Sequence, residues 1–89
     1  MRPSKNQPLI NALETEIKVR CRELEFSQED LAGDCQLNRP YISLIEVGLK
    51  QPTLSVLLRL AVSMQYTLAD FMGLVQKRYS LERMAGHAE

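Results

Sequence analysis

The 89-residue sequence is informative first for what it lacks. It has no tryptophan, four glycines and a single histidine, His87. No apolar run approaches the roughly 18 residues that a membrane-spanning helix requires, and the N-terminus lacks the apolar segment of a secretory signal peptide. We therefore expect a chain without a membrane segment, located in the cytoplasm.

Motifs for catalysis and for cofactor binding are also missing. No glycine-rich phosphate loop follows a strand pattern, and the single histidine lies in the C-terminal tail, which argues against a histidine-based triad. The two cysteines, Cys21 and Cys35, have neither CxxC nor Cys/His spacing, so we expect two small buried thiols. The sequence therefore predicts no enzyme, no cofactor and no metal site.

The overall charge gives no support to a nucleic-acid partner. Lysine and arginine number 11, as do aspartate and glutamate, so the formal net charge is zero, whereas many DNA-binding domains are basic overall. The placement of the charges therefore matters more than their sum. Acidic residues gather between positions 23 and 34, and they must point away from DNA if DNA binds.

The sequence does contain a succession of apolar stripes with helical spacing and no alternating strand pattern. A hydrophobic fraction of 45% with 25% charged residues is ordinary for a folded domain with one modest core. In order, the expected helices are 9–24, a short one after Ser27, 38–47, one from Thr53 to about Met64, a short one after Thr67, and an extra one from about Leu74 to Met84. The fourth of these helices should direct Leu54, Leu57, Leu58 and Ala61 inward.

The other segments are organised around the stretch from Ser27 to Gly48. Ser27 followed by Asp30 matches a capping box, in which aspartate replaces the more usual glutamate. Asn38 is a good N-cap for a second helix, and Gly48 suits a left-handed C-cap at its end. The pattern indicates two short helices joined by a tight turn.

The second of these helices has two unlike faces when projected at about 100° per residue. Ile42 and Ile45 share one face, which we expect to be buried. A solvated opposite face would usually carry more lysine and glutamate, so we expect this one to contact a partner. The outward and flanking residues are Arg39, Pro40, Tyr41, Ser43, Leu44 and Val47.

Three spaced elements follow one another in a fixed order: S-Q-E-D-L-A, then L-N-R-P-Y-I-S-L-I-E-x-G, then P-T-L-x-x-L-x-x-L-A. Together they resemble the Cro/repressor-type helix-turn-helix family, often called XRE-type regulators, over roughly residues 17–72. The resemblance implies an all-α, five-helix lambda-repressor-like DNA-binding domain. We assign 1–8 to a flexible N-terminal arm, 9–72 to this domain, and 73–89 to a C-terminal extension with a short extra helix.

The resemblance also implies how the chain would bind double-stranded DNA. The helix 38–47 would lie in the major groove, a docking geometry taken from the phage repressors of this family. Arginine can pair bidentately with guanine, serine bonds to several base edges, and proline and leucine pack on thymine methyls. Base contacts are therefore expected from Arg39, Pro40, Ser43 and Leu44. Phosphate contacts are expected from Gln28, Asn38, Tyr41, Lys50 and Gln51, with semi-buried packing as the alternative role for Tyr41.

The sequence departs from the family pattern beside the recognition helix. Cys21 stands where the family commonly has an arginine, which pairs with the glutamate that matches Glu46. A buried carboxylate without a partner is costly. Glu46 projects near the Ile42 side of its helix, so we expect it to be partly buried. We therefore expect either that Arg20 or Arg22 reaches Glu46, or that Glu46 faces solvent more than usual.

Two turns depart from the family pattern as well. Glu25 and Gln36 stand where the family usually has glycine. Since other residues adopt left-handed conformations only at a cost, we expect both turns to persist with some strain.

One helix reads only a few base pairs, so the resemblance implies a homodimer on a palindromic operator, with the two helices about 34 Å apart. No sensor domain fits in this length, so we expect no small-molecule effector. Phage-type repressors, controllers of restriction–modification operons and antitoxins all remain open, as does the sign of regulation. The C-terminal extension is expected either to fold back on its own domain or to form a dimer interface with Phe71 and Met72.

The alternative function is a helix-turn-helix adaptor that binds a protein, as an antitoxin binds its toxin. The zero net charge and the apolar outward residues of the helix 38–47 favour this alternative. Arg39, Lys50 and Gln28 favour DNA.

Overall fold

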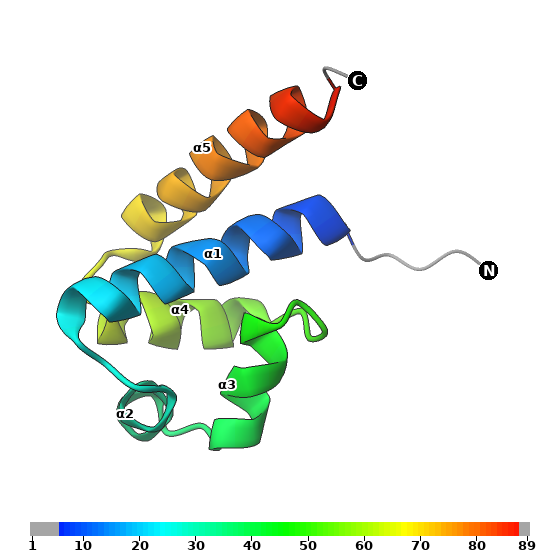
Figure 1. Cartoon of the computed structure of the whole chain (residues 1–89). Helices are drawn as coiled ribbons and strands as arrows, with labels where there is room; N and C mark the ends of the chain where they lie inside the picture. The colour runs from blue at the N-terminus through cyan, green and yellow to red at the C-terminus, as the bar shows by residue number, and fades with distance from the viewer. Residues whose placement is uncertain (1–5, 88–89) are drawn as a thin grey trace.

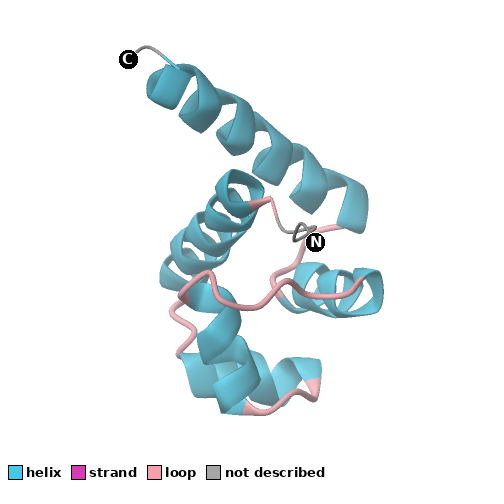
Figure 2. Cartoon of the chain, turned by 90° about the vertical axis from the view of Figure 1, so that its right-hand side faces the viewer, coloured by secondary structure: helices cyan, strands magenta, loops and turns pink. Residues whose placement is uncertain are grey.

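The computed structural model describes residues 6–87, and side chains to residue 81. Within these residues it contains helices and loops but no strand (Figures 1 and 2). The helices are α1 Gln7–Leu24, α2 Gln28–Cys35, α3 Arg39–Glu46, α4 Leu54–Ser63 and α5 Leu68–His87. The all-α fold predicted from the apolar spacing is confirmed. None of these helices is both long and apolar enough to cross a membrane.

A single core joins the five helices. α1 packs against α5 and against α3, while α4 packs against α2 and α5. Ile42 and Ile45 of α3 are each 1% exposed, so the predicted inward face of this helix is confirmed. The largest fully buried side chains are Ile17, Leu31, Ile42, Ile45, Leu60, Met64 and Phe71.

α1 begins at Gln7, two residues before the predicted start. The Asn6 side chain caps it, because its Oδ1 accepts a hydrogen bond from the Leu9 backbone N–H at 3.2 Å. Pro8 lies in the first turn, where its missing N–H costs nothing. The expected arm 1–8 is therefore corrected at 7 and 8, which are helical, while residues 1–5 lie outside the described residues.

The C-terminal part of the chain is one helix, where the sequence predicted two. Gly73 separates the two predicted helices, yet it lies inside α5. A glycine in a helix interior costs about 1 kcal/mol relative to alanine, which does not end a helix that has buried residues on both sides of the glycine, Phe71 and Val75. The expected extra helix is therefore the second half of α5.

The second half of α5 folds back on its own domain. Val75 is buried against the core, and Arg78 forms an ion pair with Glu16 of α1. The Asn6 amide also donates a hydrogen bond to the Tyr79 hydroxyl at 3.3 Å. Phe71, expected at a dimer interface in the other interpretation, is completely buried in its own core.

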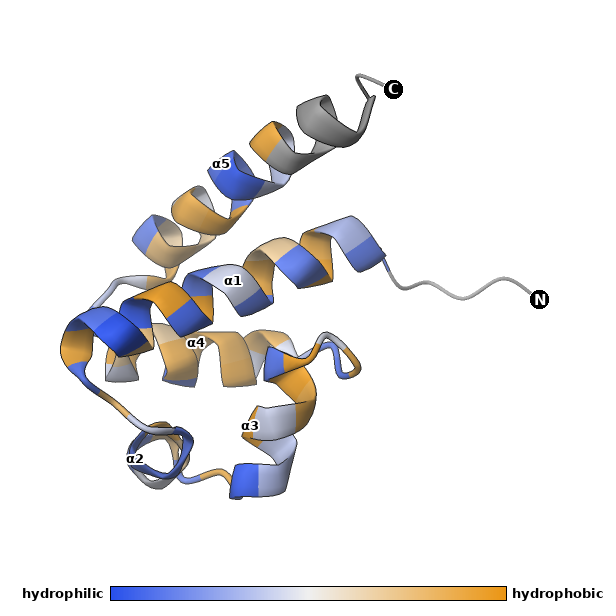
Figure 3. Cartoon of the chain, viewed as in Figure 1, coloured by the Kyte–Doolittle hydropathy of each residue, from blue (hydrophilic) through white to orange (hydrophobic). Residues whose placement is uncertain are grey.

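α4 exposes side chains that were expected to be buried. Leu54 is 69% exposed and Leu58 is 48% exposed, while Leu60 and Ala61 supply the buried face. Apolar residues occupy most positions of this helix (Figure 3), so their spacing does not select one face. Leu54, Leu58 and Val62, which is 63% exposed, follow one another at four-residue intervals and form an apolar surface that we call the α4 stripe.

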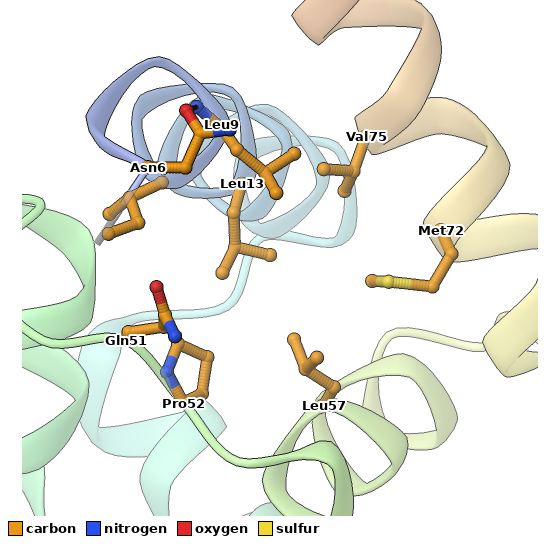
Figure 4. A pocket seen from close by; sticks show the side chains of 9 residues that line it. Asn6, Leu9, Leu13, Gln51, Pro52, Leu57, Met72 and Val75 are labelled. Atoms are coloured by element: carbon orange, nitrogen blue, oxygen red, sulfur yellow. Dashed lines mark hydrogen bonds between the residues drawn. The ribbon is translucent and has the colours of Figure 1, made fainter. Parts of the chain in front are cut away.

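An apolar hollow of about 330 Å³ lies between the start of α1, the first half of α5 and the loop that precedes α4 (Figure 4). Two amide side chains, those of Asn6 and Gln51, share its walls with aliphatic ones. Gln51, a predicted phosphate contact, therefore lies beside side chains that flank the core. The other lining residues are Leu9, Ile10, Leu13, Pro52, Leu57, Met72 and Val75.

Three non-glycine residues among those described adopt the left-handed backbone conformation, each just after the end of a helix. Glu25 has φ 59° and Gln36 has φ 60°, as predicted from the glycines that they replace. Gln65, with φ 66° after α4, was not foreseen. A left-handed conformation costs an L-residue roughly 1–2 kcal/mol, so each of these turns stores some strain.

Replacing Gln36 with glycine is expected to raise the free energy of unfolding by about 0.5–1 kcal/mol, because glycine removes the left-handed strain at some cost in unfolded-state entropy. Urea unfolding followed by circular dichroism measures the change. Gln76→Gly is the matched control, since Gln76 lies exposed within α5 and should lose about 1 kcal/mol. A loss of the same size in both variants would contradict the strain at Gln36.

Candidate nucleic-acid interface

α2 and α3 form a steeply crossed pair joined by the turn 36–38 (Figure 1). Ser27 begins α2 with a complete capping box. Its hydroxyl accepts from the Asp30 N–H at 3.0 Å, and the Asp30 carboxylate accepts from the Ser27 N–H at 2.9 Å. The hydrogen bond from the Ser27 backbone N–H holds the pKa of the Asp30 carboxyl below its usual range, and the Ser27 hydroxyl contributes a smaller lowering. The predicted capping box is confirmed.

Both ends of α3 are fixed by side chains and by glycine. Asn38 caps the start, where its Oδ1 accepts from the Tyr41 N–H at 2.8 Å. Gly48 follows the end with φ 77°, and the Gln7 amide donates to its carbonyl at 3.0 Å. A Cβ at Gly48 would lie 3.2 Å from both the Gln7 and Asn11 side chains. Another residue would therefore be strained and crowded at this position, and the first turn of α1 holds the loop after α3.

The outer face of α3 gathers the four residues expected to contact bases. Arg39 and Pro40 are exposed, Ser43 is half-buried, and Leu44 is 42% exposed. Arg39 has no ion-pair partner among the described residues. The face therefore offers one uncompensated guanidinium beside short polar and apolar side chains.

The loop after α3 brings a cation against an aromatic ring. The Lys50 Nζ lies 5.6 Å from the centre of the Tyr41 ring, a cation–π arrangement worth about 0.5–1 kcal/mol at an exposed site. The Tyr41 ring itself is partly buried against the core, which agrees with its packing interpretation. Lys50 and Gln51 are both exposed, and the Gln51 side chain also lines the apolar hollow.

Glu46 has a partner that the sequence did not predict. It is 8% exposed, and its Oε1 accepts a hydrogen bond from the Gln28 amide at 2.7 Å, a length typical of a charge-assisted bond. Neither arginine pairs with it: Arg20 is held instead by Glu23 at 3.2 Å. The expected burial of Glu46 is therefore confirmed, whereas the arginine partner and the greater exposure, the two expected ways of accommodating its charge, are both wrong. One amide hydrogen of Gln28 is committed to Glu46, which leaves the other available.

The two cysteines are buried free thiols, as expected. Burial, with a further contribution from the negative charge of Glu46, raises the pKa of Cys21 to about 11. Burial also raises the pKa of Cys35. Cys21 therefore stays neutral near pH 7 and adds no second negative charge beside Glu46. No cluster of histidine, cysteine, aspartate or glutamate in the described part of the chain has an arrangement that could hold a metal ion.

The chain is similar to the solved structures of a gene regulator and of a restriction-modification controller protein. The clp gene regulator ClgR from Corynebacterium glutamicum matches with a TM-score of 0.82 and 17% identity, over 97% of this chain and 89% of that chain, a likeness of fold. The restriction-modification controller protein C.Esp1396I matches with a TM-score of 0.73 and 28% identity, over 79% of this chain and 92% of that chain. A chain from the structure of that protein's tetramer, in complex with its natural 35 base-pair operator, matches with a TM-score of 0.73 and 28% identity. The match covers 80% of this chain and 93% of that chain.

Comparison of sequences places the chain in a family. No curated protein matches it. A family model described as helix-turn-helix matches residues 17–71, which is more than half of the chain and runs from within α1 to the first turn of α5. The five helices have the lambda-repressor-like arrangement of the similar structures. The protein therefore belongs to the Cro/repressor-type, or XRE, helix-turn-helix family, whose members are transcription regulators and not enzymes.

Proposed function

We propose that the protein regulates transcription as a homodimer, which binds a palindromic operator with α3 of each copy in the major groove. The exposed outer face of α3 carries this proposal. Arg39 stands at its first turn without an ion-pair partner among the described residues, and arginine is the side chain that most often reads guanine. Pro40, Ser43 and Leu44 complete the face that meets the base edges.

Phosphate contacts are proposed on either side of that face. The unused amide hydrogen of Gln28 and the amide group of Asn38 are donors at the starts of α2 and α3. Lys50 and Gln51 supply donors in the loop after α3, where the Tyr41 ring supports Lys50. Such contacts fix the register of the protein on DNA, whereas α3 supplies the sequence preference.

A second copy is proposed to pack on the α4 stripe. Contiguous exposed apolar side chains mark interaction surfaces, and Leu54, Leu58 and Val62 are each about half exposed or more. The tetramer of C.Esp1396I on its operator supports the assembly of such regulators on DNA. The proposal includes a cytoplasmic location and no small-molecule effector, so that operator occupancy follows the concentration of the protein.

The experiment that tests this function is selection from a random double-stranded DNA pool with the purified protein at two salt concentrations. Enrichment of a palindrome, with retention that falls as salt rises, is expected because counterions are released when phosphates are neutralised. If no sequence is enriched and retention does not depend on salt, the protein-binding adaptor becomes the better function.

Arg39→Ala is expected to weaken binding to the selected operator by about 1–3 kcal/mol and to relax the preference at one base position. Lys50→Ala is the comparison variant, because loss of a phosphate contact weakens all sequences similarly. Fluorescence anisotropy on the operator and on single-base variants separates the two effects. Unchanged affinity and base preference in Arg39→Ala would remove Arg39 from the reading face.

A further inference from the structure

A hollow of about 270 Å³, lined by both charged and apolar side chains, lies where the second half of α1 passes the start of α2 and the end of α3. Cys21 forms part of its wall, where a longer side chain would fill more of this space. Lys18 and Arg22 lie four residues apart, hence on the same face of α1. The remaining lining residues are Phe26, Gln28 and Glu46.

The charges around this hollow favour an anion at its mouth. Lys18 is half exposed and lies 3.6 Å from Glu14, whose side chain is 20% exposed, so Glu14 offsets part of its charge. Arg22 is exposed, and its side chain has no ion-pair partner among the described residues. Like charges four residues apart on a helix repel each other, so an anion between Lys18 and Arg22 would relieve an unfavourable contact.

The carboxylate in the hollow acts mainly on Gln28. Glu46 is buried and accepts one amide hydrogen of Gln28 at 2.7 Å, so it orients that amide and leaves its second hydrogen for another acceptor. Cys21 adds no charge, because burial raises the pKa of its thiol. Arg22, and Lys18 with its charge partly offset by Glu14, therefore share the lining of the hollow with one hydrogen-bonded carboxylate and an oriented amide donor.

We propose that Lys18, Arg22 and Gln28 form a subsite for one phosphodiester group of the DNA backbone, and that Glu46 positions Gln28 in it. Arginine binds phosphate bidentately and lysine binds it as a point charge, while the amide adds a third donor. The Gln28–Glu46 hydrogen bond ties this subsite to the end of α3. The inference rests on the proposed DNA binding, and it extends the phosphate contacts from α2 and α3 onto α1.

The test measures the salt dependence of binding to a mixed-sequence duplex by fluorescence anisotropy, between about 50 and 200 mM salt. Lys18→Ala and Arg22→Ala are each expected to lower the magnitude of the slope of log affinity against log salt concentration, by at most about 0.9, the value for the single phosphate that the two cations share. Arg22→Lys keeps the charge and should keep the slope. Lys77→Ala, an exposed lysine of α5, is the matched control and should change nothing.

Ethylation interference on the selected operator identifies the source of the phosphate. Interference at one backbone phosphate in each half-site is expected with the wild-type protein and with Arg22→Lys, but not with Arg22→Ala. The proposal is overturned if Arg22→Ala and Lys18→Ala keep the wild-type slope while Lys50→Ala lowers it, and DNA binding itself then stands. Wild-type protein that shows no salt-dependent binding to any duplex would instead remove the proposed function.

Discussion

Replacing Phe71 with alanine is expected to lower the free energy of unfolding by about 3–5 kcal/mol, the range for truncation of a buried aromatic side chain. Phe71 is completely buried in the first turn of α5. Its ring stacks on Tyr66 with the ring centres 5.9 Å apart and the planes at 14°. The free energy of unfolding of a small domain is about 5–15 kcal/mol in total, so this variant should be close to unfolding at room temperature.

The size of this effect follows from the place of Phe71 in the core. α5 packs against both α1 and α4, so the cavity left by the ring would loosen two contacts together. Tyr66, the stacking partner, also lies under the Arg20 guanidinium at 4.5 Å, and Arg20 donates to the Met64 carbonyl at 3.0 Å. The cluster therefore links the end of α4 to the middle of α1.

Urea unfolding followed by circular dichroism measures the loss. Leu81→Ala is the control on the same helix, because Leu81 is 59% exposed and such substitutions usually stay within about 0.5 kcal/mol. Phe71→Leu removes less volume and remains measurable if the alanine variant does not fold. A loss below about 1 kcal/mol in Phe71→Ala would contradict the packing of α5 described here.

The helix starts were predictable because capping signals act within one turn. Ser27, Asn38 and Thr53 each accept the backbone N–H three residues ahead, as their sequence context indicates. The start of α1 carried the same signal in Asn6, with Pro8 in the first turn, but this polar segment was interpreted as an arm. The continuity of α5 through Gly73 was not predictable in this way, because it depends on packing against a helix about 60 residues earlier.

The candidate site was predictable where one helix decides it. The two faces of α3 differ from each other in composition, so Ile42 and Ile45 could be assigned to its buried face. α4 is apolar nearly all round, so its spacing did not identify the buried face, and that prediction was wrong at Leu54 and Leu58. The partner of Glu46 was also missed, because charge alone favours an arginine over Gln28. The choice between them depends on which side chain the fold brings within reach.

Replacing Leu58 with lysine is expected to separate the homodimer and to lower the affinity for a palindromic operator by about 10²–10⁴-fold, the advantage that two linked sites have over one. Leu58 is the middle residue of the α4 stripe and is 48% exposed in one copy. A second copy on the stripe would bury an unpaired charge there, which is costly. The folded monomer should tolerate the change, because Leu58 is already 48% exposed and lysine and leucine have similar helix propensities.

Light scattering after gel filtration measures the assembly, and anisotropy on whole and half operators measures binding. Leu81→Lys is the matched control, since it adds the same charge to an exposed leucine of α5, away from the α4 stripe. Either variant adds a positive charge, which by itself strengthens attraction to DNA, so a loss of operator affinity in Leu58→Lys cannot come from net charge. If Leu58→Lys stays dimeric and Leu81→Lys becomes monomeric, the interface lies on α5, and the extension has the dimer role that the sequence left open.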